Sequence, residues 1–198
     1  MASGFNVSSF KQQGLIYGGA RPSQFEVYLS IPTFVAADTG SDTKFRFTCR
    51  AAQLPAATVG TIEVGYFGRM IKLAGDRTFT DWTVTVMNDE DFLVRAMFEK
   101  WSNALNALEA NQRQKYVTEE DYKATLNVIQ YSKDGNVIRS YDVIGAYPTT
   151  VDAIDLNWET QSQIESFGVT FAYDYWLPTS GSELNNTYYA QATTPVAT

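Results

Sequence analysis

Two runs of carboxylates are the residues of this chain whose types and spacing best suit chemistry. One is Asp-Glu-Asp at residues 89–91, and the other is Glu-Glu-Asp at residues 119–121. Paired carboxylates can hydrolyse glycosidic bonds, and clustered ones can bind calcium. The first run, however, precedes a helical pattern, where acids suit the positive end of the helix dipole. The second lies in a polar segment, and neither has the ligand spacing of an EF-hand. We therefore expect helix-terminus and solvation roles for both runs.

Other catalytic signatures are missing from the sequence. There is no histidine, so the commonest general base and metal ligand is absent. The single cysteine, Cys49, cannot form an internal disulfide, and we expect it to be a small buried side chain. No phosphate-binding loop or dinucleotide-binding glycine motif occurs. We predict no catalytic, cofactor-binding or metal-binding residues, and hence no enzyme.

Composition indicates a folded protein that does not bind nucleic acid specifically. The 198 residues carry a net charge of −7, and 44% of them are hydrophobic. A negative surface gains nothing from counterion release on DNA. No stretch of about 18 residues is continuously apolar, so we expect no membrane anchor. The N-terminus lacks the basic start and apolar run of a signal peptide, so we expect synthesis in the cytoplasm.

The first carboxylate run lies between a strand pattern and a helix pattern. From Phe79 to Met87, Trp82, Val84 and Val86 alternate with polar residues, which predicts a strand with one buried face. A helix is predicted over about residues 89–108, and its apolar stripe would pack on the sheet. The stripe consists of Leu93, Met97, Trp101, Leu105 and Leu108.

Alternation predicts further strands along the chain. The pair Asp134-Gly135 is a strong hairpin turn between two of them. We expect the first two strands to form a hairpin with a long connection, and residues 145–148 to interrupt a strand. The predicted strands cover residues 25–31, 45–52, 122–131, 137–144, 153–158 and 164–176.

Three segments differ from this pattern. Residues 55–77 contain four glycines and alternating apolar residues, which predicts a partly extended excursion from the main body. Residues 1–23 form a polar, glycine-rich N-terminal arm, and residues 177–198 form a polar C-terminal tail without Lys or Arg. The single domain is therefore expected to span residues 24–176.

Three stretches carry a family resemblance. AGDRTFTDWTVTVMNDED at residues 74–91, FTCRAAQLPA at 47–56 and YPTTVDAIDLNWETQSQIESFGVTFAYDYW at 147–176 resemble, in this order and spacing, the tail tube proteins of contractile-tailed bacteriophages. The resemblance covers roughly residues 20–176. It implies a mainly β fold of two packed antiparallel sheets, barrel-like or sandwich-like, with one flanking α-helix.

The resemblance also implies a structural function. Six copies would close into a ring, and rings would stack into a rigid inner tube that conducts DNA and penetrates the host envelope. The implied partners are other copies, the tail sheath protein, and baseplate and tube-terminating proteins, with DNA as passing cargo. The implied location is the virion tail. Residues 55–77 would pack on the adjacent ring, with Arg69, Lys72, Asp76 and Arg77 as contacts.

Two further surfaces are hypotheses. The acidic start of the helix would face the sheath, through Asp89, Glu90, Asp91 and Glu99. The last strand has a bulky face and a small, mostly polar face, and the polar face would line an acidic lumen that repels phosphate. Its candidate lumen residues are Ser166, Thr170 and Asp174.

Two alternatives remain open on the sequence. A tube protein of a secretion or extracellular injection system would have the same ring architecture. A monomeric all-β module that binds glycans through exposed Trp and Tyr belongs to a different class. The first alternative is decided by neighbouring genes, and the second by whether the protein stays monomeric.

Overall fold

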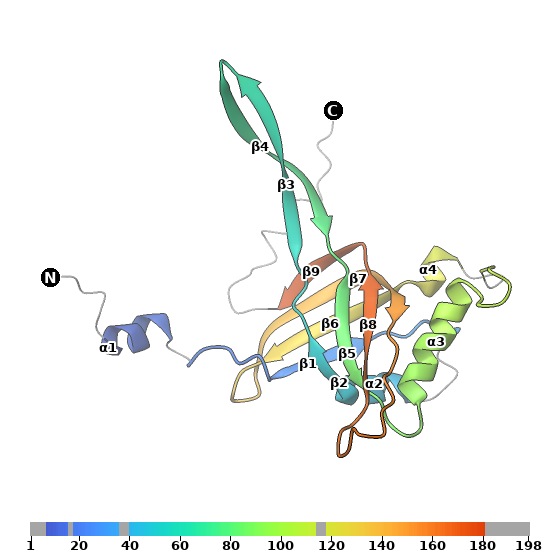
Figure 1. Cartoon of the computed structure of the whole chain (residues 1–198). Helices are drawn as coiled ribbons and strands as arrows, with labels where there is room; N and C mark the ends of the chain where they lie inside the picture. Colours follow the sequence, from blue (N-terminus) through green and yellow to red (C-terminus); the bar gives the residue numbers. More distant parts are fainter. Residues whose placement is uncertain (1–6, 16–17, 36–39, 114–117, 181–198) are drawn as a thin grey trace.

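A seven-stranded antiparallel sheet forms the body of the protein (Figure 1). The computed structural model describes residues 7–15, 18–35, 40–113 and 118–180. The strand order is β1-β6-β7-β8-β5-β2, and β9 also pairs with β7. The strands are β1 (Phe25–Leu29), β2 (Cys49–Ala52), β5 (Trp82–Met87), β6 (Ala124–Tyr131), β7 (Val137–Val151), β8 (Ser166–Ala172) and β9 (Tyr175–Ser180).

The long strand β7 joins the two halves of this sheet. Its first part pairs with β6 and β9, and its last residues pair with β8. Gly145, with a φ of 72°, lies near this change, just after the last pair with β9 and one residue before the last pair with β6. β1 and β2 stand at the ends of the strand order, and no pairing joins them within the described residues. The sheet of the described chain is therefore curved and open, so the mainly β fold is confirmed but its barrel-like closure is not.

The core lies between the inner face of this sheet and two helices, α2 (Ser41–Thr48) and α3 (Leu93–Leu105). The predicted alternation in β5 is confirmed, because Trp82, Val84 and Val86 are buried. The ring of Phe98 in α3 meets two other rings edge to face, Phe171 of β8 at 5.8 Å and Phe45 of α2 at 5.7 Å. Such contacts make the aromatic residues large contributors to core stability.

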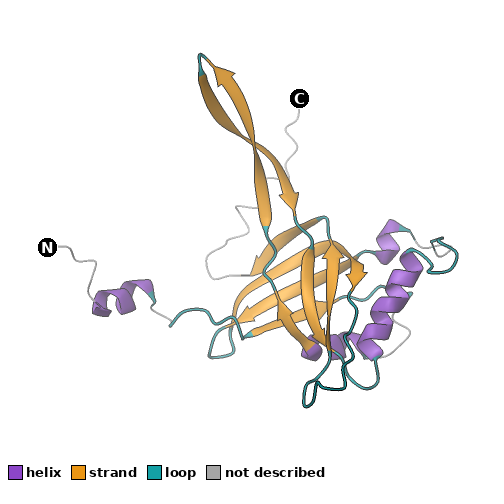
Figure 2. Cartoon of the chain, in the orientation of Figure 1, coloured by secondary structure: helices purple, strands orange, loops and turns teal. Residues whose placement is uncertain are grey.

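A twisted hairpin of β3 (Ala57–Tyr66) and β4 (Arg69–Phe79) extends away from the body (Figure 2). It forms a separate two-stranded sheet. Phe67 and Gly68 link its strands, and both have positive φ, as a type I′ turn requires. The predicted excursion at residues 55–77 is thus confirmed, and it takes the form of a regular hairpin.

The prediction of a strand over residues 45–52 is wrong in its first half. Residues 41–48 form α2, which inserts Phe45 into the core and leaves Phe47 exposed. Tertiary packing of a single aromatic side chain overrides the strand pattern here. The expected hairpin between the first two strands is also absent, since β1 pairs with β6 and β2 pairs with β5.

The helix predicted over residues 89–108 is shorter at both ends. It begins at Leu93, after Phe92 adopts a left-handed conformation, and it ends at Leu105. Leu108 lies outside it and is 89% exposed. Further helical segments occur besides the one expected: α1 (Val7–Ser9), a π-helical segment η2 (Phe10–Gly14), α2, and α4 (Glu119–Tyr122).

Three other boundaries differ from the prediction. β7 continues through residues 145–148, because Gly145 adopts a conformation that bends the strand without ending it. Residues 153–158 form no strand. β9 extends to Ser180, so part of the expected tail belongs to the sheet. The remaining tail residues, 181–198, and residues 1–6 and 16–17 of the arm lie outside the described residues.

Candidate assembly surfaces

The β3–β4 hairpin has one apolar face that is exposed to solvent. Ile62 pairs with Leu73 and Val64 with Ile71, and directly opposed residues share a face. Tyr66 continues this face towards the turn. These five side chains are between 44% and 62% exposed. We call them the apolar face of the hairpin: Ile62, Val64, Tyr66, Ile71 and Leu73.

The opposite face of the hairpin is mostly polar or small, apart from Met70, which is 61% exposed. Glu63 opposes Lys72 there, and their charged groups lie 3.6 Å apart. The four residues predicted as ring contacts are therefore spread over the hairpin. Arg69 opposes Tyr66 near the turn, Lys72 lies on the polar face, and residues 76–77 lie nearer the body.

The base of the hairpin is fixed to the body. The Tyr173 hydroxyl and the Trp176 indole N–H both donate to the backbone carbonyl of Ala56, each at 3.3 Å. The Phe79 and Tyr173 rings lie 5.9 Å apart. These contacts connect the hairpin to the end of β8 and the start of β9, so its direction is set by the sheet.

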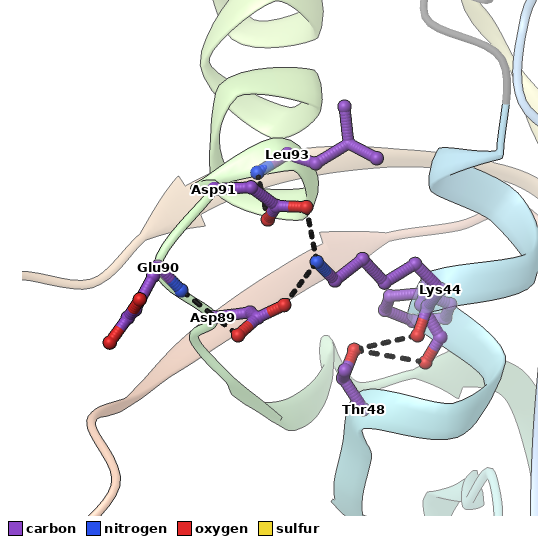
Figure 3. Close-up of polar contacts among 7 residues, drawn as sticks. Lys44, Thr48, Asp89, Glu90, Asp91 and Leu93 are labelled. Atoms are coloured by element: carbon purple, nitrogen blue, oxygen red, sulfur yellow. Dashed lines mark hydrogen bonds and ion pairs between the residues drawn. The ribbon is translucent and has the colours of Figure 1, made fainter.

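The acidic run before α3 is bound by a lysine of α2 (Figure 3). Lys44 Nζ donates to Asp89 Oδ2 and to Asp91 Oδ2. The other oxygens accept backbone N–H groups, Asp89 Oδ1 from Glu90 at 3.0 Å and Asp91 Oδ1 from Leu93 at 3.1 Å. The Glu90 side chain points away from Lys44 (Figure 3). This arrangement connects α2 to the start of α3.

The hydrogen bonds from Lys44 lower the pKa of Asp89 and of Asp91 below the ordinary aspartate value. The same bonds raise the pKa of Lys44. Of the four acids predicted to face the sheath, Asp89 and Asp91 thus share one lysine of the same chain. Glu99 accepts from Arg95 at 2.8 Å, one helical turn away. The sequence did not indicate the lysine, because it lies 45 residues from Asp89.

The second carboxylate run lies at the start of a short helix, α4, and not in a polar linker as the sequence indicated. Asp121 accepts a hydrogen bond from the backbone N–H of Thr118 at 2.8 Å, which completes a capping box at the start of α4. Its pKa is lowered, mainly by hydrogen bonds from Thr118.

The outer face of β8 carries small polar groups. Ser166 and Thr170 lie on it, opposite the buried side of the strand. Thr170 Oγ1 lies 3.1 Å from Thr83 Oγ1 of β5, and its backbone carbonyl accepts from Thr149 at 3.1 Å. Asp174 lies beyond the end of β8, where both carboxylate oxygens accept from Lys123 Nζ at 3.1 and 3.0 Å. The structure therefore groups Ser166 with Thr170 but places Asp174 in an ion pair.

The described residues contain no group of three or more His, Cys, Asp or Glu able to hold a metal ion. Burial raises the pKa of the Cys49 thiol to about 12, so the thiol stays protonated. None of the helices in the described part of the chain combines the length and apolarity that a membrane crossing needs.

Comparison with solved structures connects this fold to contractile tubes. The chain is similar to a chain of an extracellular contractile injection system, the PVC sheath–tube complex in its extended state, with a TM-score of 0.56, 15% identity, and coverage of 88% of this chain and 98% of that chain. A chain from the anti-feeding prophage baseplate gives a TM-score of 0.59 at 13% identity, over 84% of this chain and 98% of that chain. At these identities the likeness concerns the fold alone.

Sequence comparison is more specific. The chain is 38% identical to the tail tube protein gp19 of Enterobacteria phage T4 over 160 residues, which cover 79% of this chain and 90% of the relative. The tail tube protein of Serratia phage KSP90 is 24% identical over 159 residues, which cover 79% and 86%. A family model described as phage tail tube protein matches residues 20–179. This chain therefore belongs to the phage tail tube protein family and is a structural component of the virion tail.

Proposed function

We propose that this tail tube protein assembles into hexameric rings, and that the rings stack into the inner tube of a contractile tail. The tube would conduct DNA and penetrate the host envelope inside the sheath. Family membership supports a tail tube, and it suggests a structural rather than enzymatic role. The main observation that supports self-assembly is the exposed apolar face of the hairpin.

An isolated two-stranded hairpin is only marginally stable in water. This one also holds five large apolar side chains in solvent, including Ile62, Ile71 and Leu73. Contiguous exposed apolar surface usually marks a protein–protein contact. A second copy that covers this face would stabilise both the hairpin and the assembly.

The open edges of the sheet support ring formation. β1 and β2 lie at the ends of the strand order, so each has one edge without a strand partner in the described chain. Unpaired edges favour pairing with other chains, and closure into a barrel removes such edges. We propose that neighbouring subunits pair at these edges and so complete a continuous inner wall.

The outer face of β8 is our candidate for the lumen wall, through Ser166 and Thr170, with Asp174 just beyond the end of the strand. Hydroxyl groups would offer DNA no positive charge, and Lys123 is neutralised by Asp174. The net charge of −7 supports a wall that repels phosphate. Tubes of the Thr170→Lys variant should retain DNA in a salt-dependent way. If these tubes release DNA as readily as tubes of the unsubstituted protein, this face does not line the lumen.

The outer partners would be the sheath, the baseplate and tube-terminating proteins. For the sheath we propose the acidic surface at the start of α3, with Glu90 as its freest member beside Asp89, Asp91 and Glu99. Contacts between exposed charges are weak and screened by salt. Such contacts suit a surface that the sheath must leave on contraction.

Negative-stain electron microscopy of the purified protein tests the architecture. We expect hollow tubes whose top views have sixfold symmetry. Rings of another symmetry would refute the hexamer, and single subunits in every field would favour the glycan-binding alternative. The 38% identity to a phage tail tube protein, against 15% to the injection-system chain, favours the phage tube over the injection-system alternative.

A further inference from the structure

We propose that the apolar face of the hairpin docks on the β7–β8 connection, residues 152–165, of a second copy of this chain. The inference rests on the proposed stacking of rings and adds the receptor for the hairpin. It uses two surfaces that no contact within the chain covers.

The β7–β8 connection presents large apolar side chains to solvent. Trp158 is 99% exposed, Leu156 81% and Ile164 70%. Trp158 lies in a turn in which Thr160 N–H donates to the Asn157 carbonyl at 3.2 Å. Trp is enriched among the few side chains that carry most of the binding energy of an interface.

Contacts with the body hold both ends of this connection in place. At one end the Asp152 N–H donates to Gly168 at 2.9 Å, and the Asp152 carbonyl accepts from Arg95 at 3.0 Å. At the other end, Glu165 accepts two hydrogen bonds from Asn88, at 2.8 and 3.1 Å. A surface that is ordered before binding loses little entropy when a partner docks.

The charges of the two surfaces are complementary. The connection contains four acids and no Lys or Arg, whereas the hairpin has three basic and two acidic residues, a net charge of +1 in a chain of net charge −7. Arg69 lies beside Tyr66 on the apolar face, where it would meet the acids that flank Trp158. An arginine can also stack on a Trp ring. The acids are Asp152, Asp155, Glu159 and Glu165, and the hairpin charges are Arg69, Lys72, Arg77, Glu63 and Asp76.

The two surfaces lie at opposite ends of the molecule. In Figure 1 the hairpin extends from the top of the body, and the β7–β8 connection forms a loop at the bottom. A contact between different surfaces at opposite ends repeats in one direction and produces an open filament. Stacked rings require this geometry, because each ring must offer one surface upward and the other downward.

Cross-linking between two single-cysteine proteins tests the contact. Both carry Cys49→Ala; one carries Phe67→Cys at the hairpin turn, and the other Thr160→Cys beside Trp158. After mixing under assembly conditions and addition of a short bis-maleimide, we expect a covalent heterodimer on a denaturing gel. The matched control replaces Thr160→Cys by Lys133→Cys, in the turn between β6 and β7, and should give little product.

The outcomes separate this inference from the proposed function. If particles assemble but Phe67→Cys gives no cross-link to Thr160→Cys, or an equal cross-link to Lys133→Cys, the proposed docking site is wrong. The proposal that the protein forms a tube would still stand. Absence of assembled particles in electron micrographs of the unsubstituted protein would refute the stacking proposal, and the docking site with it.

Truncation of the central side chain gives a second test. Trp158→Ala should raise the protein concentration needed for assembly by about 30-fold or more, as expected for an interface Trp. It should leave thermal unfolding of the monomer unchanged, because Trp158 is exposed in the single chain. Leu108→Ala, another exposed apolar residue, is the control. If Trp158→Ala assembles at the same concentration as the unsubstituted protein, the proposal is wrong.

A charge exchange tests the polar part of the contact. Arg69→Glu should weaken assembly, and Glu159→Arg in the same chain should restore it, since the pair is reformed between copies. If the double variant assembles no better than Arg69→Glu alone, these two residues are not opposed.

Discussion

The carboxylate of Asp174 lies directly against the α-carbon of Gly145, at the point where the sheet bends. A Cβ atom at Gly145 would overlap Oδ2 of Asp174. The Asp174 N–H also donates to the Ile144 carbonyl at 3.0 Å, and Lys123 holds the carboxylate from the other side. Asp174, proposed from the sequence as a lumen residue, therefore has a charged partner within the chain, Lys123.

We predict that Gly145→Ala destabilises the protein by about 2–5 kcal/mol, the sum of a left-handed conformation and a steric overlap. Chemical denaturation of the monomer measures this change. Gly135→Ala is the matched control, because Gly135 has a φ of 80° but open space around it. It should cost only about 1–2 kcal/mol. Equal losses for both variants would show that the contact with Asp174 does not matter.

A second prediction concerns the core contact between α3 and the sheet. Phe98→Ala should cost about 3–5 kcal/mol, because Phe98 is fully buried against Phe45 and Phe171. Leu108→Ala should change the free energy of unfolding by less than about 0.5 kcal/mol, since the side chain is exposed. A large loss for Leu108→Ala would mean that the helix extends as the sequence pattern indicates.

The contacts of Lys44 predict a pH dependence. Because the native pKa values of Asp89 and Asp91 lie below their ordinary value of 3.8, their contribution is complete above that pH and is lost as pH falls through the native values. The contribution of Lys44, whose native pKa is raised, is complete below 10.5 and is lost as pH rises through the native value.

Lys44→Met removes these contacts. The free energy of unfolding of the unsubstituted protein should therefore fall more steeply than that of Lys44→Met as the pH drops below about 4. Denaturation curves at a series of acidic pH values measure the difference between the two proteins. Parallel curves would show that the two carboxylates gain nothing from Lys44.

The sheath proposal predicts different effects for the four acids. Glu90→Lys should reduce sheath assembly around preformed tubes and leave tube formation intact, because the Glu90 side chain points away from Lys44. Asp89→Lys should impair both sheath assembly and subunit stability, since it removes a partner of Lys44. Electron microscopy of tubes mixed with sheath protein gives the readout. Normal sheathing of Glu90→Lys tubes would exclude this surface.

The sequence predicted those elements that a local pattern is enough to specify. They are the strands β5 and β8, from their alternation, and the turn at Asp134-Gly135, from its turn residues. The helix α2 was missed because Phe45 is its one large buried residue, which gives no helical stripe. The end of β9 was missed because its pairing with β7 depends on residues more than 30 positions away.

The candidate surfaces show the same limit. Glycines and alternation located the hairpin, but the charged residues were chosen as contacts and the apolar face was not. An exposed apolar face and a buried one have the same alternation, so only the structure separates Ile62 and Val64 from core residues such as Val84. Likewise, the exposed state of Trp158 follows from the absence of a strand at residues 153–158.

Sedimentation velocity across a concentration series tests the central claim, assembly through the apolar face of the hairpin. The unsubstituted protein should form large assemblies as concentration rises, whereas Ile62→Asp/Ile71→Asp should remain a folded single subunit or at most a single ring. Thr61→Asp/Ala74→Asp adds the same charge to the opposite face and should still assemble. Two results would contradict the claim. One is that the Ile62→Asp/Ile71→Asp variant assembles at the same concentration as the unsubstituted protein, and the other is that the unsubstituted protein stays monomeric at every concentration.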